Sequence, residues 1–299
     1  MTAAAKTSHI ISELASKVTA FAARTAIGPE RRTPVDGLIA VHSHRPTALE
    51  GALYEPSFCL ILQGRKSVQL GELELEFAVQ DAVIVSHDLP VLAKITEAQQ
   101  SRPFVALALE IDLALVQALR GEIGEDTTAS GPTRSLERGQ ADPPLIQAMA
   151  RLFELVDQPQ DAQVLAPLVR REIHYRLLKA PHGQTLRQLL EHRSHASQIA
   201  RAIAVLRRSF AEPLSVNELA HAAGMSESSF HEHFKSLTAT SPLQYQKSLR
   251  LLEARRLLAA GAHNVTETAF EVGYQSPNQF SREYSRHFGH SPRHDLSPV

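Results

Sequence analysis

Near the C-terminus, Asn278 and Arg282 have the side chains and the spacing needed to recognise the edge of a base pair. Residues four apart lie on one face of a helix. From such a face, Arg can donate two hydrogen bonds to guanine, and Asn can form a bidentate pair with adenine. The competing interpretation is a solvated Arg282 that pairs with Glu283 or Glu267. The elements around this helix decide between the two.

The residues before and after Asn278 predict a pair of short helices. Asn264 and Glu267 match a capping box, and Gly273 follows where a left-handed residue can end the first helix. Ser276 and Gln279 predict a second capping box at the start of the next helix. The buried face of that helix is predicted to carry aromatic residues spaced four apart: Phe280, Tyr284 and Phe288.

The same unit occurs once more, about 50 residues earlier in the chain. Ser215 and Glu218 repeat the capping box, and Gly224 repeats the helix end. Ser226 caps the second helix, whose aromatic residues are Phe230 and Phe234. One copy would fit an ordinary helical hairpin. Two copies in one register indicate a pair of helix-turn-helix units that bind DNA.

Residues 242–260 connect the two units and predict one continuous helix. After Pro242 no Pro or Gly interrupts this stretch, and its apolar residues alternate with Gln, Arg and Lys. About 17 residues at 1.5 Å each make a rod of roughly 26 Å. Such a rod can hold two recognition helices about one turn of DNA apart, roughly 34 Å.

Over about the last hundred residues, short motifs follow in a fixed order: Gly224-Met-Ser226, Phe230-x3-Phe234-Lys235, Ser241-Pro242-x2-Tyr245, Ala254-Arg255-x-Leu257-Leu258, Ala269-x2-Val272-Gly273-Tyr274-x-Ser276, Phe280-Ser-Arg282-x-Tyr284-x3-Phe288-Gly289 and Ser291-Pro292. In this order the stretch resembles the AraC/XylS family of transcription regulators. The resemblance implies that one helix of each unit reads bases. The candidate readers are Ser228, Ser229, His231 and Glu232 in the first helix, and Asn278, Gln279 and Arg282 in the second. Phosphate contacts, which hold register, are expected from Lys235, Arg250, Arg286 and the helix N-termini.

The first half of the chain predicts a small all-β domain. Short apolar runs punctuated by Gly, Asp and Pro favour a barrel or sandwich; they cover residues 38–42, 57–63, 67–70, 73–77, 82–86, 91–96 and 104–111. An amphipathic helix is predicted before them, at residues 8–25. After them we expect a loop at residues 122–140 and helices at residues 143–156 and 164–179.

The segment Tyr54-Glu-Pro56-Ser-Phe-Cys59-Leu-Ile-Leu-Gln63-Gly64-Arg65-Lys66 resembles the cupin-like N-terminal domain of one AraC-type subgroup, as does Asp88-Leu-Pro90-Val91. The resemblance implies a barrel that senses an effector and dimerises. The polar candidates for contact with a small-molecule effector are Tyr54, Gln63 and Arg65. Cys59, inside an apolar run, is interpreted as a small buried hydrophobe, and the alternative is a thiol that senses electrophiles.

A second interpretation of the barrel is a metal-dependent cupin enzyme that carries a DNA-binding tail. His42, His44, Glu50 and His87 offer imidazole and carboxylate groups. Glu50 is further from the two histidines than cupin metal motifs place it, and the glycines of those motifs are missing. We therefore expect no metal, no cofactor and no catalytic residues. A third interpretation is a regulator whose barrel only dimerises.

The composition restricts the possible functions of the chain only weakly. The 299 residues carry a net charge of −1, with eleven Lys/Arg against nine Asp/Glu from residue 196 onward. This balance neither requires nor excludes DNA binding, because a few Arg on one face can suffice. The single cysteine suits a reducing cytoplasm. The chain lacks a long apolar run and a charged start before an apolar core, so we expect no membrane span and no signal peptide.

Taken together, these patterns predict an α+β chain. Residues 1–183 are expected to form the cupin-like sensor with a helical connector, and residues 197–299 the all-α domain with two helix-turn-helix units. The expected function is sequence-specific regulation of transcription controlled by a small molecule. The expected partners are double-stranded DNA, the effector, a second copy of the chain and RNA polymerase.

Overall fold

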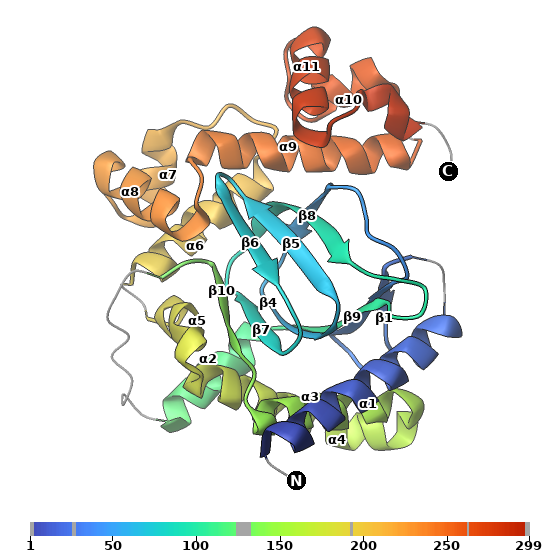
Figure 1. Ribbon diagram of the computed structural model, residues 1–299. Coiled ribbons are helices and arrows are strands. Elements are labelled where there is room, and N and C mark those ends of the chain that lie inside the picture. Colours follow the sequence, from blue (N-terminus) through green and yellow to red (C-terminus); the bar gives the residue numbers. More distant parts are fainter. Residues whose placement is uncertain (1–2, 26–27, 124–132, 192–193, 262, 297–299) are drawn as a thin grey trace.

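In the computed structural model, which describes residues 3–25, 28–123, 133–191, 194–261 and 263–296, two antiparallel sheets face each other (Figure 1). The six-stranded sheet has the order β1-β2-β9-β4-β7-β10, and the four-stranded sheet has the order β3-β8-β5-β6. Their bounds are β1 (Glu30–Arg32), β2 (Leu38–Ser43), β3 (Glu50–Tyr54), β4 (Ser57–Gln63), β5 (Arg65–Leu70), β6 (Leu73–Phe77), β7 (Asp81–Val85), β8 (Leu89–Glu97), β9 (Phe104–Glu110) and β10 (Leu136–Gln140).

The predicted α+β class is confirmed, with a sheet-rich N-terminal part and a helical C-terminal part. The expected closed barrel is not shown. Among the strand pairings of the described residues, none joins the two sheets, which therefore face each other without closing into one hydrogen-bonded cylinder. Three strands of the structure were not predicted from the sequence, namely β1, β3 and β10. The described part of the predicted loop 122–140 contains β10, which pairs with β7; residues 124–132 lie outside the described residues.

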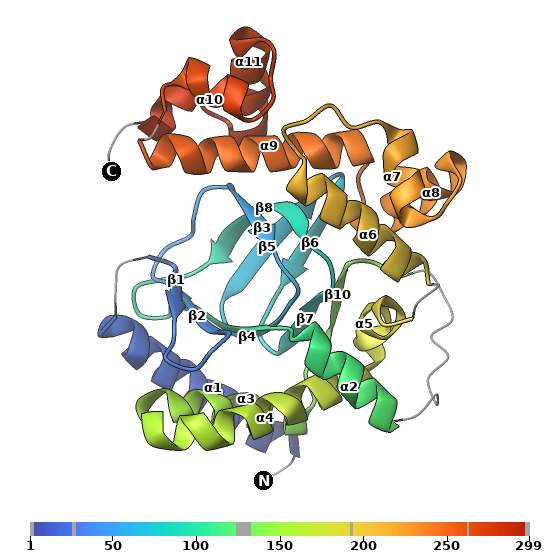
Figure 2. The same cartoon turned by 180° about the vertical axis from the view of Figure 1, so that it is seen from behind.

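Alternation along the strands separates two cores. In β4, Phe58 and Leu60 belong to the cluster beneath the helices, whereas Cys59 and Ile61 belong to the cluster between the sheets. This is the period of two that a strand imposes on its side chains. Helices α1 (Ala3–Ala23), α3 (Pro143–Glu154) and α4 (Pro159–Lys179) lie on the outer side of the six-stranded sheet, as Figure 1 and Figure 2 show.

Further elements precede the C-terminal part, and Figure 2 labels α2, α5 and α6 among them. Before the first helix-turn-helix unit lie α2 (Leu113–Ile123), η1 (Leu155–Asp157), η2 (Pro181–Gly183), α5 (Gln184–Leu189) and α6 (His195–Arg208). The predicted connecting rod is α9 (Pro242–Ala259), which lies across the open end of the sheets. None of the helices in the described ranges is long and apolar enough to cross a membrane.

The C-terminal part packs directly on the sheets. One apolar cluster runs from Val68 and Phe104 between the sheets to Ile199 of α6 and to Phe234 and Tyr245 beyond it. A side chain at Gly51 would have its Cβ 2.6 Å from atoms of Leu252 and Phe288. The two predicted domains are therefore in close contact, and little room is left for larger side chains at this surface.

Polar contacts surround this apolar contact surface. Arg207 of α6 lies 3.0 Å from the carboxylate of Asp88 and 3.1 Å from that of Glu55. The hydroxyl of Tyr245 donates to the backbone oxygen of Asp88. The backbone nitrogen of Ser135 donates to the oxygen of Leu237, at 2.9 Å. These bonds join the turns at Glu55 and Asp88 and the start of β10 to α6, α8 and α9.

His87 lies at the centre of this contact and is 3% exposed. Its Nε2 donates to the backbone oxygen of Ala196 at 3.0 Å, because a carbonyl can only accept. Its Nδ1 therefore accepts from the hydroxyls of Ser86 and Ser135, at 2.9 and 3.0 Å. Both nitrogens are satisfied by a neutral ring. Burial lowers the pKa of His87 to about 4, which the hydrogen bond to Ala196 only partly opposes.

We predict that stability falls as the pH is lowered from about 6.5 to about 4. The unfolded ring takes up a proton near its ordinary pKa of about 6.5, whereas the folded ring resists it down to about 4. The neutral ring therefore contributes fully above pH 6.5, and up to roughly 3 kcal/mol is lost across this window. Urea unfolding at several pH values should show a shallower decline in His87→Gln, whose amide can also donate to Ala196. Coincident pH profiles would mean that His87 is not held neutral.

Candidate nucleic-acid interface

The first helix-turn-helix unit consists of α7 (Val216–Ala223) and α8 (Glu227–Thr238). The Ser215 hydroxyl accepts from the nitrogen of Glu218 at 3.2 Å, and the Glu218 carboxylate accepts from the nitrogen of Ser215 at 2.9 Å. This confirms the predicted capping box. Gly224 ends α7 with a φ of 70°, which glycine adopts without strain. Ser226 caps α8 as predicted.

The second unit consists of α10 (Val265–Glu271) and α11 (Pro277–Phe288), followed by η3 (Pro292–Leu296). Asn264 and Glu267 form the predicted capping box. The capping box predicted at Ser276 is only half formed: its hydroxyl accepts from the nitrogen of Gln279 at 3.4 Å. The side chain of Gln279 instead donates to Glu283 at 3.2 Å.

Aromatic residues fill the interior of both units, as predicted. Phe230 and Phe234 of α8 are fully buried, and Phe234 meets Tyr245 edge-on at a centroid distance of 5.4 Å. In α11, Phe280 and Tyr284 are fully buried and 5.5 Å apart. Because these rings are buried, the opposite face of each recognition helix is the one exposed to solvent.

The outward face of α11 brings the predicted readers together. Asn278, Gln279 and Arg282 are exposed, and so is Arg286 one turn further along. The Nε of Arg282 donates to the backbone oxygen of Asn278 at 3.3 Å. In the part of the chain that the structure describes, no ion pair involves Arg282 or Arg286.

The acidic partners considered for Arg282 are engaged elsewhere. Glu283 lies 3.3 Å from Lys247 and accepts from the Tyr274 hydroxyl at 2.8 Å. Glu267 completes the capping box of α10. The geometry therefore leaves the guanidinium of Arg282 free to approach another molecule.

The outward face of α8 is less basic. Ser228, His231, Glu232 and Lys235 are exposed, and Ser229 is partly buried. Lys235 is the one lysine or arginine of this set. The two recognition helices thus present different chemistry, with hydroxyl, imidazole and carboxylate groups on α8 and amide and guanidinium groups on α11.

Arg250 has a role different from the predicted phosphate contact. Its guanidinium is partly buried and donates to four backbone oxygens, at 2.7 Å from Phe210, 3.1 Å from Ala211, 3.1 Å from Glu212 and 3.0 Å from Gly273. With its donors engaged in this way, Arg250 joins the segment before α7 to the turn before α11. We therefore assign it a structural role between the two units.

Gly273 makes this close approach possible. Its φ is 85°, and a Cβ there would lie 2.0 Å from the backbone oxygen of Ala211. Any other residue would both strain the backbone and push the Ala211 segment away. Gly273 and Arg250 together hold one unit against the other.

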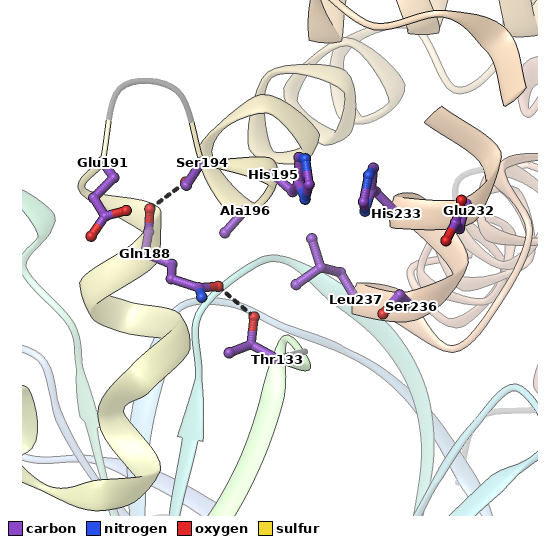
Figure 3. A pocket seen from close by; sticks show the side chains of 10 residues that line it. All are labelled: Thr133, Gln188, Glu191, Ser194, His195, Ala196, Glu232, His233, Ser236 and Leu237. Carbon is purple, nitrogen blue, oxygen red and sulfur yellow. Dashed lines mark hydrogen bonds between the residues drawn. The ribbon is translucent and has the colours of Figure 1, made fainter. Parts of the chain in front are cut away.

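A cavity of about 460 Å³ lies where α5, α6 and α8 meet (Figure 3). The rings of His195 and His233 stack across it, with centroids 3.4 Å apart and planes 26° apart. Desolvation and the neighbouring His195 lower the pKa of His233. Glu232, a predicted base reader, also borders this cavity from α8. The segment before the DNA-binding part therefore touches a recognition helix directly.

The effector candidates lie on different sides of the sheets. The Arg65 guanidinium is outside, 3.0 Å from Glu97 and 3.4 Å from Glu76. The Gln63 amide donates to the backbone oxygen of Pro103 at 2.7 Å. Tyr54 is packed against the cluster between the sheets. Lys66, which the sequence analysis did not select, has its ammonium 5.2 Å from the Tyr54 ring centroid.

Lys66 and Cys59 give the space between the sheets its polar character. Burial opposes the charge of Lys66, but Tyr54, Cys59 and Glu30 outweigh it and raise the pKa of the ammonium. Burial raises the pKa of the Cys59 thiol to about 11, despite an opposing contribution from Lys66. A thiol with that pKa is not a thiolate at neutral pH, which favours the packing role over an electrophile sensor.

The residues of the metal-cupin alternative do not converge. Both nitrogens of His87 are hydrogen-bonded at the contact with α6. His42 meets His44 edge-on at a centroid distance of 4.6 Å, and Glu50 is exposed on a strand of the other sheet.

Two protein families match this chain. The family of AraC-type transcriptional regulator N-termini matches residues 34–185, and a helix-turn-helix domain family matches residues 219–296. The HTH-type transcriptional activator RhaS of Escherichia fergusonii is 32% identical over 149 residues, which cover 50% of this chain and 53% of RhaS. RhaS of Escherichia coli is 29% identical over 150 residues, with the same coverage. The chain thus spans about half the length of the curated relatives it matches.

Solved structures of ToxT from Vibrio cholerae share the fold over most of the chain. Wild-type ToxT with a bound unsaturated fatty acid gives a TM-score of 0.56 at 11% identity and covers 89% of this chain and 96% of its own. A second ToxT structure gives a TM-score of 0.53 at 10% identity, covering 88% of this chain and 99% of its own. With one family match over half of the sequence and a second over its C-terminal part, the chain belongs to the AraC/XylS family of transcriptional regulators.

Proposed function

We propose that this protein is a sequence-specific transcription regulator that binds double-stranded DNA through both helix-turn-helix units. One observation carries the proposal: Asn278 and Arg282 lie exposed on α11, opposite the buried rings of Phe280 and Tyr284. A helix held by its aromatic face and free on its amide and guanidinium face suits the major groove.

Position on the DNA would come from contacts other than base contacts. Lys235 and Arg286 are exposed on the recognition helices and can contact phosphates. The N-termini of α8 and α11 add partial positive charge. This set of phosphate-contacting groups is small, which agrees with a net charge of only −1 for the chain.

A small-molecule effector would bind between the two sheets, and the polar groups there suggest a carboxylate. Lys66 is a cation next to Tyr54 in an otherwise apolar cluster. ToxT, which has the same fold, has been solved with an unsaturated fatty acid, and this acid combines an apolar chain with a carboxylate. Of the three predicted effector residues, Tyr54 stays in the proposed site, the Gln63 amide is hydrogen-bonded to Pro103, and Arg65 lies outside. We propose Lys66 instead of Arg65.

The signal would pass through the contact of the sheets with α6 and α9, the helices that flank the first unit. His87, Tyr245 and Arg207 all bond across that contact. A ligand that displaces the inner strands would alter these bonds and thereby the position of α8.

Contact with RNA polymerase and a cytoplasmic location complete the proposal. No observation favours an enzyme.

The proposed dimer would form through α4. Of its apolar residues, Ile173 and Leu177 are buried in the cluster that α4 shares with α2 and α3, whereas Val164, Leu168 and Tyr175 are 67%, 61% and 42% exposed. These three residues recur at helical spacing and make one apolar stripe. A stripe of this kind is suited to pair with the same stripe of a second copy.

The first prediction concerns base recognition. Arg282→Ala should weaken specific DNA binding by about 1–3 kcal/mol and relax preference at one base position, because a bidentate contact is lost. Arg286→Ala, the matched control on the same helix, should weaken all sequences alike and reduce the salt slope by about one. Binding to a selected site and to scrambled DNA at several salt concentrations measures both effects. An unchanged specific-to-scrambled ratio in Arg282→Ala would show that α11 does not read bases through this residue.

The second prediction concerns the effector. Decanoate should raise the melting temperature and decanol should not, because only the carboxylate can pair with the Lys66 ammonium. Lys66→Met should abolish the difference between the two ligands. Arg65→Met removes the neighbouring cation on the outer face and should leave it intact. Equal responses of the wild type and Lys66→Met to decanoate would remove Lys66 from the site.

The third prediction concerns oligomeric state. The full chain should sediment as a dimer at tens of micromolar, and Leu168→Glu should be a monomer, because it buries a charge in an apolar interface. Leu243→Glu changes a residue of similar exposure, 65%, on α9 and should remain a dimer. A wild-type monomer at this concentration would contradict the assignment of α4.

A further inference from the structure

Three potential metal ligands gather at the C-terminal end of the second helix-turn-helix unit. His290 follows α11, and His294 and Asp295 belong to η3. One ligand atom from each can be chosen so that all three lie within 4.8 Å of one another. Neither the family match nor the proposed DNA contacts give these three residues a role.

We propose that His290, His294 and Asp295 bind a divalent transition-metal ion of the Zn²⁺ type. The Nδ1 atom of His294 lies 3.7 Å from Oδ1 of Asp295, and the Nδ1 atom of His290 lies 3.8 Å from Oδ2. The two rings are 4.5 Å apart. In a tetrahedral zinc site, bonds of about 2.0–2.1 Å put neighbouring ligand atoms roughly 3.3 Å apart. These two His–Asp pairs would each have to shorten by about half an ångström, and the three ligand atoms as a set lie within 4.8 Å of one another.

Asp295 is held in place by groups on two other elements. Its Oδ2 accepts from the hydroxyl of Tyr284 on α11, whose side chain is fully buried. Arg255 of α9 lies 3.6 Å from the same oxygen. Both approach Oδ2, the oxygen that also faces His290, whereas Oδ1 faces His294. A carboxylate oriented by a buried hydroxyl is the kind of support that metal ligands require.

The ligand types select the ion. Two imidazole nitrogens and one carboxylate oxygen suit zinc, cobalt, nickel or copper, whereas magnesium and calcium prefer oxygen alone. The side chains of Asp295, His290 and His294 are 12%, 28% and 71% exposed, so an ion can enter from solvent and keep a water ligand. The positive charge of Arg255 opposes a second cation, so this site should bind more weakly than one with three free ligands.

An ion at this position would tie η3 to the rest of the second unit. Asp295 already connects η3 to α11 and α9 through Tyr284 and Arg255. The added bonds from His290 and His294 would close the segment that follows α11 into a metal-bound loop. Metal binding should therefore stabilise the folded chain against heat.

The test is a titration of the full chain, freed of metal by a chelator, with Zn²⁺ followed by calorimetry. We expect one saturable ion per chain and a higher melting temperature, and no effect of Mg²⁺ at the same concentration. A stabilisation of equal size by Mg²⁺ would overturn the proposal, and so would several weak and equivalent Zn²⁺ sites, because either result would describe unspecific binding by surface groups.

Variants decide whether these residues are the ligands. His294→Ala removes a side chain that is largely exposed, so the fold should be kept, and the affinity for Zn²⁺ should fall at least about tenfold. His263→Ala is the matched control, because His263 lies 3.9 Å from Glu267 in the same unit but belongs to no three-ligand group among the described residues. It should bind Zn²⁺ as the wild type does. Unchanged affinity in His294→Ala, or an equal loss in His263→Ala, would refute the assignment.

Discussion

The apolar contact between the sheets and α6 is the interaction on which the arrangement of the whole chain depends. Ile199 and Leu206 of α6 are buried in the same cluster as the side chains between the two sheets. Burial of this kind has no direction of its own. Orientation comes from the polar bonds at its edge, above all the neutral ring of His87 on the oxygen of Ala196. The contact makes the sheet-rich part a support for the first helix-turn-helix unit.

The second unit is joined to the first by a contact of a different kind, which is polar. Arg250 reaches from the middle of α9 to the backbone on both sides, and Gly273 lets the chain come close enough for this. A guanidinium with several backbone acceptors is rigid, because its donors lie in one plane. The apolar contact thus places the first unit, and Arg250 adds a polar connection between the two units beside the apolar packing of α10 and α11 on α9.

The sequence predicted well where structure is local. Caps and periodic apolar residues follow short-range rules, so Ser215, Glu218, Asn264 and Ser226 were assigned correctly, as was the rod that became α9. Strand β10 has a polar sequence, and only pairing with β7 makes it a strand.

The face of a sheet to which a side chain points is equally hard to predict from sequence. Arg65 and Lys66 are neighbours in sequence, and strand alternation sends one outward and the other inward, a choice that depends on the opposite sheet. Arg250 looked like a surface cation because its acceptors come from distant segments. The cluster of His290, His294 and Asp295 was not predicted for a similar reason. Tyr284 and Arg255, which orient the Asp295 carboxylate, come from two other helices.

The unbroken course of α9 has a consequence for the DNA on which such a protein would act. Its interior, from Leu243 to Ala259, contains neither Gly nor Pro, so α9 itself has no hinge. A duplex turns by roughly 35° for each base pair, given 10–10.5 base pairs per turn. One inserted base pair between the two contacted sites would rotate the second site away from α11 by that angle. A rigid α9 cannot take up this rotation, so the DNA would have to twist or bend to restore the fit, at an elastic cost. The length and stiffness of one helix therefore translate into a fixed helical phase for the two halves of the target sequence.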